Sequence, residues 1–150
     1  MKKGFQMNYT LEEYLGIKVA KVRNSIKSEM EIALLPYEIT TTQFVVLLKL
    51  CEKDKMTQKD LAIETNHKQS ALTLILDKLE SKKLIIRQAK ENDRRAYLIA
   101  ITKEGIELEN KLIIIAKELE KRILDGISET QKKEFLYILD KIYYNLNKDK

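Results

Sequence analysis

The chain has 150 residues, 44% hydrophobic and 34% charged, which is enough to bury one sizeable core in a single domain. One proline, four glycines and no tryptophan favour a mainly α fold over a sandwich or barrel with many tight turns. The lone Cys51 and lone His67 exclude an internal disulfide and leave no cluster for a catalytic metal, so no cofactor is expected; the net charge of +5 is compatible with a polyanionic partner.

Residues 4–10 contain no apolar run of signal-peptide length, and no stretch approaches the roughly 18 apolar residues of a membrane span, so a cytoplasmic protein is expected. Apolar residues spaced three and four apart predict an amphipathic helix over 11–35, which Pro36 should end. A second helix is predicted over 42–53. Cys51 belongs to its apolar surface, which favours a buried small hydrophobe with a raised pKa over an exposed thiol that senses oxidants.

The segment after Met56 predicts a short helix that begins with a cap. Thr57 can cap the first turn, Asp60 follows three residues later, and Met56 can pack on Leu61 as a hydrophobic staple. This helix should end by Thr65 and Asn66, because asparagine tolerates the left-handed conformation that closes a tight turn. A new helical pattern begins at about Lys68, so the spacing predicts a helix-turn-helix.

The second helix of this pair, predicted over 68–81, has two distinct faces. One arc should join the core and consists of Leu72, Ile75, Leu76 and Leu79; the opposite arc consists of Gln69, Ser70, Thr73, Leu74 and Asp77. Short polar side chains on the second arc can approach base edges or phosphates. The alternative is an ordinary solvated face, which is favoured by Asp77 because its carboxylate repels phosphate.

A two-stranded ribbon is predicted next, with strands over 84–89 and 96–101 joined by a polar loop through Arg94. Tyr97, Ile99 and Ile101 should share one face of the returning strand. The segment 92–102 sets two adjacent arginines at the tip of this ribbon, where a permanent cation suits the negative potential of a narrow DNA minor groove. Taken alone, an exposed Asp-Arg-Arg loop favours an ordinary solvated surface, so the minor-groove interpretation depends on the elements that precede it.

The rest of the chain predicts two amphipathic helices. A long helix should start at Thr102, and Ser128 with Gln131 forms a capping box for a final helix. Their apolar residues extend beyond a single face, which indicates a partner helix, most simply from a second copy of the chain. The residues that extend the stripes are Ile113, Ile114, Ile138 and Tyr143.

This order of elements resembles the MarR family of bacterial winged helix-turn-helix transcriptional regulators over nearly the whole chain. The family's wing pattern, Asp-x-Arg followed after five residues by an aliphatic residue and threonine, is matched by Asp93, Arg95, Ile101 and Thr102, and Lys-Glu-Gly at 103–105 matches the family's helix start. The resemblance implies one domain over 1–150, with a winged helix-turn-helix at about 40–102 and dimerisation helices at about 10–35 and 103–147.

The resemblance also implies the roles of site residues. The helix over 68–81 would lie in the major groove, Arg95 would enter the minor groove with Asp93 orienting it, and Arg94 would contact phosphate. The sequence departs from the family at Leu74, where arginine is frequent, and at Asn66 and Lys83, where glycines are frequent. The candidate DNA-binding residues are Thr57, Lys68, Gln69, Ser70, Thr73, Leu74, Asp93, Arg94 and Arg95.

The expected function is therefore a homodimeric, sequence-specific regulator of transcription that binds double-stranded DNA and acts as a repressor on a palindromic operator. The alternative is a helical protein-interaction module without sequence-specific DNA binding, which the modest net charge and Leu74 favour. An enzyme is not expected, because no phosphate-binding glycine loop or nucleophile with a histidine partner is present. The family resemblance also implies a small-molecule effector, with Tyr14, Tyr37 and Tyr97 as possible linings.

Overall fold

The computed structural model describes residues 10, 14–90 and 93–148, and the side chains of these residues outside 90–96. The chain divides into two compact units, Met1–Ala116 and Lys117–Lys150. The predicted fold class is confirmed, because long helices accompany one small antiparallel sheet. In the order of the chain the elements are α1 (Leu15–Leu34), η2 (Leu35–Tyr37), α2 (Thr41–Glu52), β1 (Met56–Thr57), α3 (Gln58–Glu64), α4 (Gln69–Ser81), β2 (Ile85–Lys90), β3 (Asp93–Ile101), α5 (Lys103–Ile123) and α6 (Glu129–Asn147).

The first helix ends slightly earlier than predicted. Pro36 lies inside the 3-10 turn η2, where its fixed φ is tolerated near the start of a helical turn, and Glu38 then takes a left-handed φ of 54°. The predicted start of this helix at residues 11–13 lies outside the described residues. The next helix, α2, begins with a capping box that was not predicted: the Thr40 hydroxyl accepts from the Gln43 amide, and the Gln43 side chain accepts from the Thr40 amide.

The helix-turn-helix is confirmed as α3 followed by α4. Thr57 caps α3, since its hydroxyl accepts from the Asp60 amide at 3.1 Å. Both helices end in the same way: Asn66 (φ 53°) and Lys83 (φ 60°) adopt the left-handed conformation, and the amide of the residue after each donates to a carbonyl five residues earlier. This pattern is a Schellman motif. Its left-handed residue is usually glycine, which has no Cβ to oppose that conformation, and this explains why glycine would suit both sites.

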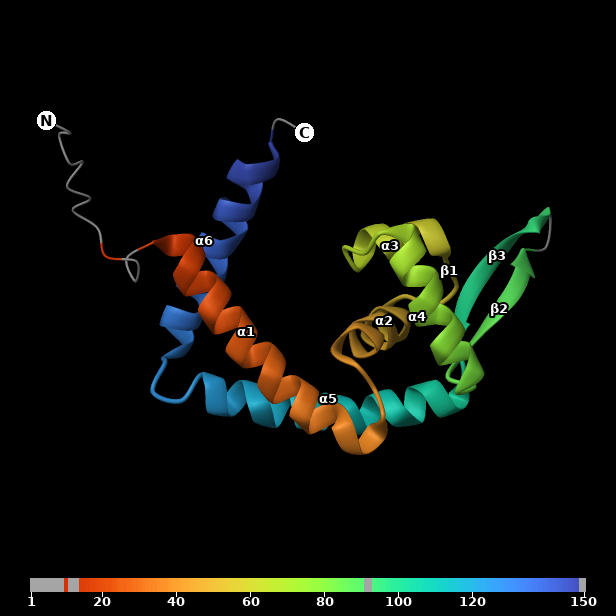
Figure 1. Ribbon diagram of the computed structural model, residues 1–150, viewed down its shortest axis with the longest axis horizontal. Helices are drawn as coiled ribbons and strands as arrows, with labels where there is room; N and C mark the ends of the chain where they lie inside the picture. Colours follow the sequence, from red (N-terminus) through yellow and green to blue (C-terminus); the bar gives the residue numbers. More distant parts are fainter. Residues whose placement is uncertain (1–9, 11–13, 91–92, 149–150) are drawn as a thin grey trace, which may run out of the picture. The chain divides into compact units, whose positions relative to one another are not determined.

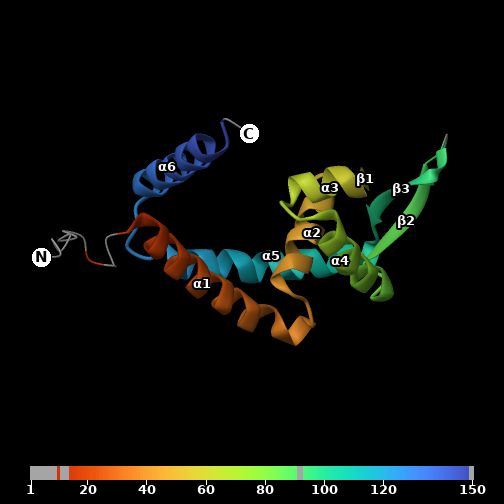
Figure 2. The same ribbon diagram turned by 45° about the horizontal axis from the view of Figure 1, so that its top comes forward.

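The sheet has the strand order β1-β3-β2, with both pairings antiparallel. Strand β1 was not predicted; its two residues pair with Ile99 and Leu98 of β3. Strand β3 begins at Asp93, three residues before the predicted start, and the pairing with β2 shifts register between Ala89 and Lys90. Figures 1 and 2 both show β2 and β3 as a hairpin that extends away from the helices of its unit; Asn92 in the hairpin loop lies outside the described residues.

The base of this hairpin is joined closely to the start of α5. The Thr102 hydroxyl accepts from the Gly105 amide at 3.0 Å and donates to the Lys83 carbonyl at 2.7 Å, while the Thr102 amide donates to the Leu84 carbonyl at 3.0 Å. A Cβ on Gly105 would overlap the Leu84 carbonyl oxygen and lie 2.7 Å from Cγ1 of Ile101. Glycine is therefore required here for close approach of two backbones.

The core of the first unit is formed by one cluster of aliphatic side chains from the helices and the sheet. The predicted inner face of α4 is confirmed, because Leu72, Leu76 and Leu79 are fully buried and Ile75 is partly buried. Of the residues predicted to share a strand face, Ile99 is buried and Ile101 packs against the core, but Tyr97 lies toward the hairpin end and is 53% exposed. The largest fully buried side chains are Leu34, Leu47, Leu50, Leu61, Leu72, Leu76, Leu79, Ile85, Ile99, Leu112 and Val46.

The second unit contains the end of α5 and the whole of α6. The predicted capping box is confirmed, since the Ser128 hydroxyl accepts from the Gln131 amide and the Gln131 side chain accepts from the Ser128 amide. Lys132 forms an ion pair with Glu120 at 2.8 Å. The apolar side chains of α6 remain largely exposed; those above 45% are Phe135, Leu136, Tyr137, Ile138, Tyr143, Tyr144 and Leu146.

Within the described ranges no single helix is long and apolar enough to cross a membrane; the segments 15–37 and 41–52, bent by 79° at the break between them, reach that length and composition only as a pair.

Candidate nucleic-acid interface

The outward face of α4 is the part of the helix-turn-helix that is open to solvent. Lys68 occupies the N-cap position, and Gln69 and Ser70 in the first turn are exposed. One turn later Thr73 is half-buried and Leu74 is 66% exposed. The structure therefore places on one exposed helix face the residues that the sequence predicted there, with hydrogen-bonding groups in the first turn and an aliphatic side chain after them.

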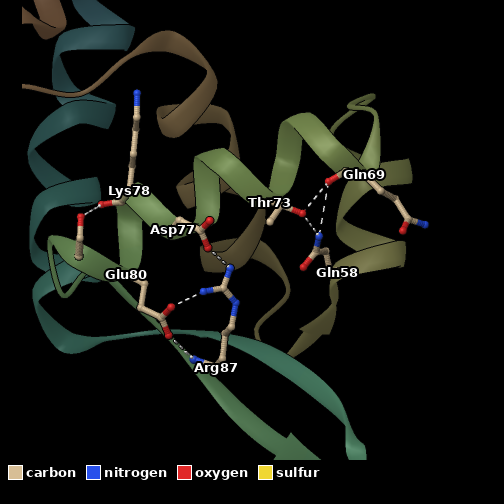
Figure 3. A network of polar contacts seen from close by, with 8 residues as sticks. Gln58, Gln69, Thr73, Asp77, Lys78, Glu80 and Arg87 are labelled. Atoms are coloured by element: carbon tan, nitrogen blue, oxygen red, sulfur yellow. Dashed lines mark hydrogen bonds and ion pairs between the residues drawn. The ribbon is translucent and has the colours of Figure 1, made fainter.

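Thr73 is held by a contact that the sequence did not predict. Its hydroxyl donates to the Gln69 carbonyl at 3.0 Å and accepts from the side-chain amide of Gln58, the first residue of α3, at 2.6 Å. The same amide lies 3.4 Å from the Gln69 carbonyl. Figure 3 shows Gln58 reaching across to Thr73, while the Gln69 side chain points away from this contact. Gln58 thus fixes the first turn of α4 relative to α3 and leaves the Gln69 side chain available.

The second half of α4 carries two acidic residues that are paired with a single arginine. Arg87 of β2 contacts Asp77 at 2.6 Å through Nη2 and contacts Glu80 through Nη1, and its backbone amide donates to Glu80 at 3.3 Å. The three side chains lie between the helix and the strand in Figure 3. The predicted repulsion between Asp77 and phosphate is therefore balanced by a cation that sequence analysis did not assign to this surface.

The two lysines after α4 have different surroundings. Lys82 donates to the Glu38 carbonyl at 2.6 Å, which links the end of α4 to the segment between η2 and α2. Lys83 is exposed, and its left-handed backbone lies directly before the wing. Lys83 therefore adds an accessible positive charge at the junction between the helix and the hairpin.

The wing residues Asp93, Arg94 and Arg95 lie at the beginning of β3, beyond the point where the pairing shifts register. Their backbone is described, but their side chains lie outside the described part of the chain. The segment belongs to the same hairpin whose base is bonded to α5 through Thr102. Asp93 pairs with Lys90 of β2, whereas β1 pairs only with Leu98 and Ile99, farther along β3.

Cys51 differs from its predicted environment. The residue is exposed rather than buried, because it lies in the last turn of α2, where solvent reaches the helix. Its predicted raised pKa is supported: partial desolvation, followed by the nearby negative charge of Glu109, raises the pKa of the thiol to about 11. The thiol therefore has the exposure of a reactive cysteine without the electropositive neighbour that would favour a thiolate.

The three tyrosines considered as effector linings belong to separate elements. Tyr14 precedes α1 and is 45% exposed, Tyr37 lies in η2 and is 37% exposed, and Tyr97 lies in β3 and is 53% exposed. Each side chain is therefore accessible to a ligand. An effector role for any of the three stays a prediction. Among the residues that the structure describes, no three His, Cys, Asp or Glu side chains gather as a metal site would require.

Comparison with known proteins identifies one matching family model and solved structures of similar fold. The model of the MarR family matches residues 39–97, which extend from before α2 into β3. The structure resembles BpsR of Bordetella bronchiseptica, whose DNA binding is regulated by 6-hydroxynicotinic acid, with a TM-score of 0.83, 21% identity and coverage of 90% of this chain and 96% of that one.

Two structures of CouR show the same likeness. CouR from Rhodococcus jostii RHA1, bound to p-coumaroyl-CoA, has a TM-score of 0.81 and 25% identity, with coverage of 89% of this chain and 94% of that one. The transcriptional repressor CouR bound to a 23-mer DNA duplex has a TM-score of 0.83, 23% identity and the same coverage. The similarity thus extends over nearly the full length of each protein.

Proposed function

We propose that this chain is a member of the MarR family, whose model matches residues 39–97, and that it is a sequence-specific regulator of transcription that binds double-stranded DNA as a homodimer. It acts in the cytoplasm by binding rather than by catalysis. It acts as a repressor, because a dimer bound to promoter DNA excludes RNA polymerase. The observation that carries the proposal is the exposed face of α4 beside a hairpin that begins with Asp93, Arg94 and Arg95.

In this proposal α4 enters the major groove. Gln69 can make a bidentate contact to adenine, and Ser70 can donate to a base or a phosphate. Leu74 is two-thirds exposed and suits apolar contact with a thymine methyl group. Lys68 and Thr57 lie at the N-termini of the two helices, where backbone amides and a positive dipole favour phosphate.

The hairpin supplies the second contact. Arg95 would enter the minor groove, with Asp93 orienting it and Arg94 contacting a phosphate. Dimerisation would use exposed apolar side chains of α1 and the side of α6 that carries Phe135, Ile138 and Leu146, which are open to solvent in the single chain. The whole chain would then be one MarR-type domain, with the winged helix-turn-helix at about 40–102 and dimerisation helices at about 10–35 and 103–147. DNA-bound and ligand-bound CouR support a duplex partner and a small-molecule effector of this chain.

Selection from random duplex DNA tests the function directly. Purified protein would be incubated with a pool of random duplexes, and the retained fraction sequenced. We expect enrichment of an inverted repeat whose half-sites are about one helical turn apart. A folded dimer that enriches no motif, and whose duplex affinity depends weakly on salt, would instead favour the protein-interaction module, since phosphate contacts make affinity fall steeply with salt.

The wing has its own prediction. Arg95→Ala should weaken binding to the selected duplex by about 1 to 3 kcal/mol, the range of a good groove contact. Fluorescence anisotropy titrations of the wild-type and variant proteins would measure the change. Lys53→Ala, which removes a cation from the exposed end of α2, is the control and should bind as the wild type does. Equal affinity of the Arg95 variant would contradict the assignment of the wing.

A further inference from the structure

We propose that Arg87 is a positioning residue for DNA recognition: it balances the charge of Asp77 on the DNA-facing side of α4 and holds strand β2 of the wing against that helix. The inference rests on the proposed function. It adds a residue of β2 to a recognition surface that the sequence assigned to α4 and to the tip of the hairpin.

The geometry places one guanidinium between two carboxylates. Nη2 lies 2.6 Å from Asp77 Oδ1, and Nη1 bonds to Glu80 Oε2. The other oxygen of Glu80 accepts from the backbone amide of Arg87 at 3.3 Å. The strand is therefore attached to the helix through both its side chain and its main chain, as Figure 3 shows.

Asp77 needs this partner because of where it lies on the helix. At about 100° per residue it shares an arc with Ser70, Thr73 and Leu74, the residues proposed to face the major groove. Its side chain is 55% exposed. An unbalanced carboxylate at that position would repel the phosphates on either side of the groove and so weaken DNA binding.

Arg87 is suited to balance this charge and poorly placed to contact DNA itself. Its side chain is only 24% exposed, and both terminal nitrogens are already bonded to carboxylates. The planar guanidinium can reach two acids at once, which a single ammonium group cannot do with the same geometry. The cluster of three charges thus carries one net negative charge instead of the two that the acids alone would place on α4.

The test is a double-mutant cycle on the full-length dimer with the selected duplex. Arg87→Gln should weaken binding about 5- to 10-fold, the order of one unbalanced charge several ångströms from phosphate at an intermediate dielectric. Arg87→Gln combined with Asp77→Asn restores the wild-type net charge and should return affinity to within about twofold of the wild type. Lys49→Gln, which removes a cation on α2 that is paired with Glu52 and Glu64 and is assigned neither to DNA contact nor to dimerisation, is the matched control and should leave affinity unchanged.

The salt dependence separates the alternatives. For a positioning residue, the slope of log affinity against log salt should return to its wild-type value in the double variant, because that variant restores the net charge beside the groove. A salt slope smaller in magnitude by about one in Arg87→Gln, together with an affinity that the double variant does not recover, would overturn the inference in favour of a direct contact between Arg87 and a phosphate. A lowered melting temperature without recovery would assign Arg87 to folding alone.

Two further outcomes are decisive. If Arg87→Gln does not fold, Asp77→Asn alone provides the measurement: it removes one negative charge beside the groove and leaves Arg87 bonded to Glu80, so affinity should rise by a similar 5- to 10-fold, and a loss of affinity would overturn the inference. Wild-type affinity in Arg87→Gln, in a protein that selects a DNA motif, would overturn the inference and leave the proposed function intact. A wild-type protein that selects no motif contradicts both.

Discussion

At the scale of single residues, polar side chains that cross between elements organise the recognition surface. Gln58 connects α3 to the first turn of α4, Arg87 connects the wing to its last turns, and Lys82 connects its end to the Glu38 carbonyl. Helix α4 is therefore attached to other elements at its first turn, in its last turns and just after its end. None of these contacts follows a local pattern, because their partners lie 7 to 44 residues away along the chain.

Cys51 gives a prediction at this scale. With a pKa of about 11, roughly one thiol in several thousand is ionised at pH 7.5, so alkylation by iodoacetamide should be slow and should accelerate about tenfold per pH unit up to pH 10. Glu109→Gln removes a nearby negative charge and should lower the pKa, which speeds alkylation at pH 7.5. Glu107→Gln on the exposed side of α5 serves as the control. A rate that levels off near pH 8 would show a stabilised thiolate instead.

The sequence predicted the position of Cys51 incorrectly for a simple reason. Periodicity assigns a residue to a helix face, and Cys51 follows Leu47 and Leu48 at the apolar spacing. The exposure of a terminal turn depends on what packs beyond it, which periodicity does not contain. The raised pKa was predicted as a result of burial; part of it has another origin, the carboxylate of Glu109 on a helix more than fifty residues away.

At the scale of elements, caps define where the helices begin. The sequence predicted a cap at Thr57 and a capping box at Ser128, and both are present. The box at Thr40 was not predicted because three consecutive threonines offer several equivalent starts. Strand β1 was not predicted because two residues cannot establish an alternating pattern; only pairing with β3 defines it.

The two neighbouring threonines at the start of α2 provide a matched test. Thr40→Ala removes a capping hydroxyl and should lower the free energy of unfolding by about 1 kcal/mol. Thr41→Val should be neutral or stabilising, because the Thr41 hydroxyl is buried and has no hydrogen-bond partner among the described residues. Urea denaturation at fixed protein concentration measures both. Equal losses in the two variants would contradict the role of the cap.

At the scale of the whole molecule, apolar surface exceeds what each unit can cover. On α6, Phe135, Ile138 and Leu146 lie on one side at helical spacing together with the less exposed Leu139 and Ile142. The sequence predicted this excess from the width of the apolar stripes, because composition and period are local properties. How the two copies would pair cannot be read from a single chain, since pairing depends on the shapes of two surfaces.

The proposed homodimer is tested on this helix. Phe135→Asp should shift the protein toward monomer and weaken duplex binding by more than tenfold, because two linked recognition helices bind far more tightly than one. Tyr137→Asp places the same charge on the opposite side of α6 and should leave the dimer intact. Sedimentation velocity over a range of concentrations measures the assembly. A Phe135→Asp variant that stays dimeric would exclude this face as the interface.

The close contact between the base of the wing and the start of α5 also restricts which substitutions this chain can tolerate. Glycine is the only residue without a Cβ, so every amino-acid-changing mutation in the codon for residue 105 adds an atom where the Leu84 carbonyl already lies. At Gly16 an added Cβ would meet nothing within 4 Å, so the same class of mutation there has room for its product. Substitutions of residue 105 are therefore expected to be selected against, whereas the packing around residue 16 raises no such obstacle, and the difference comes from a backbone more than twenty residues away from Gly105.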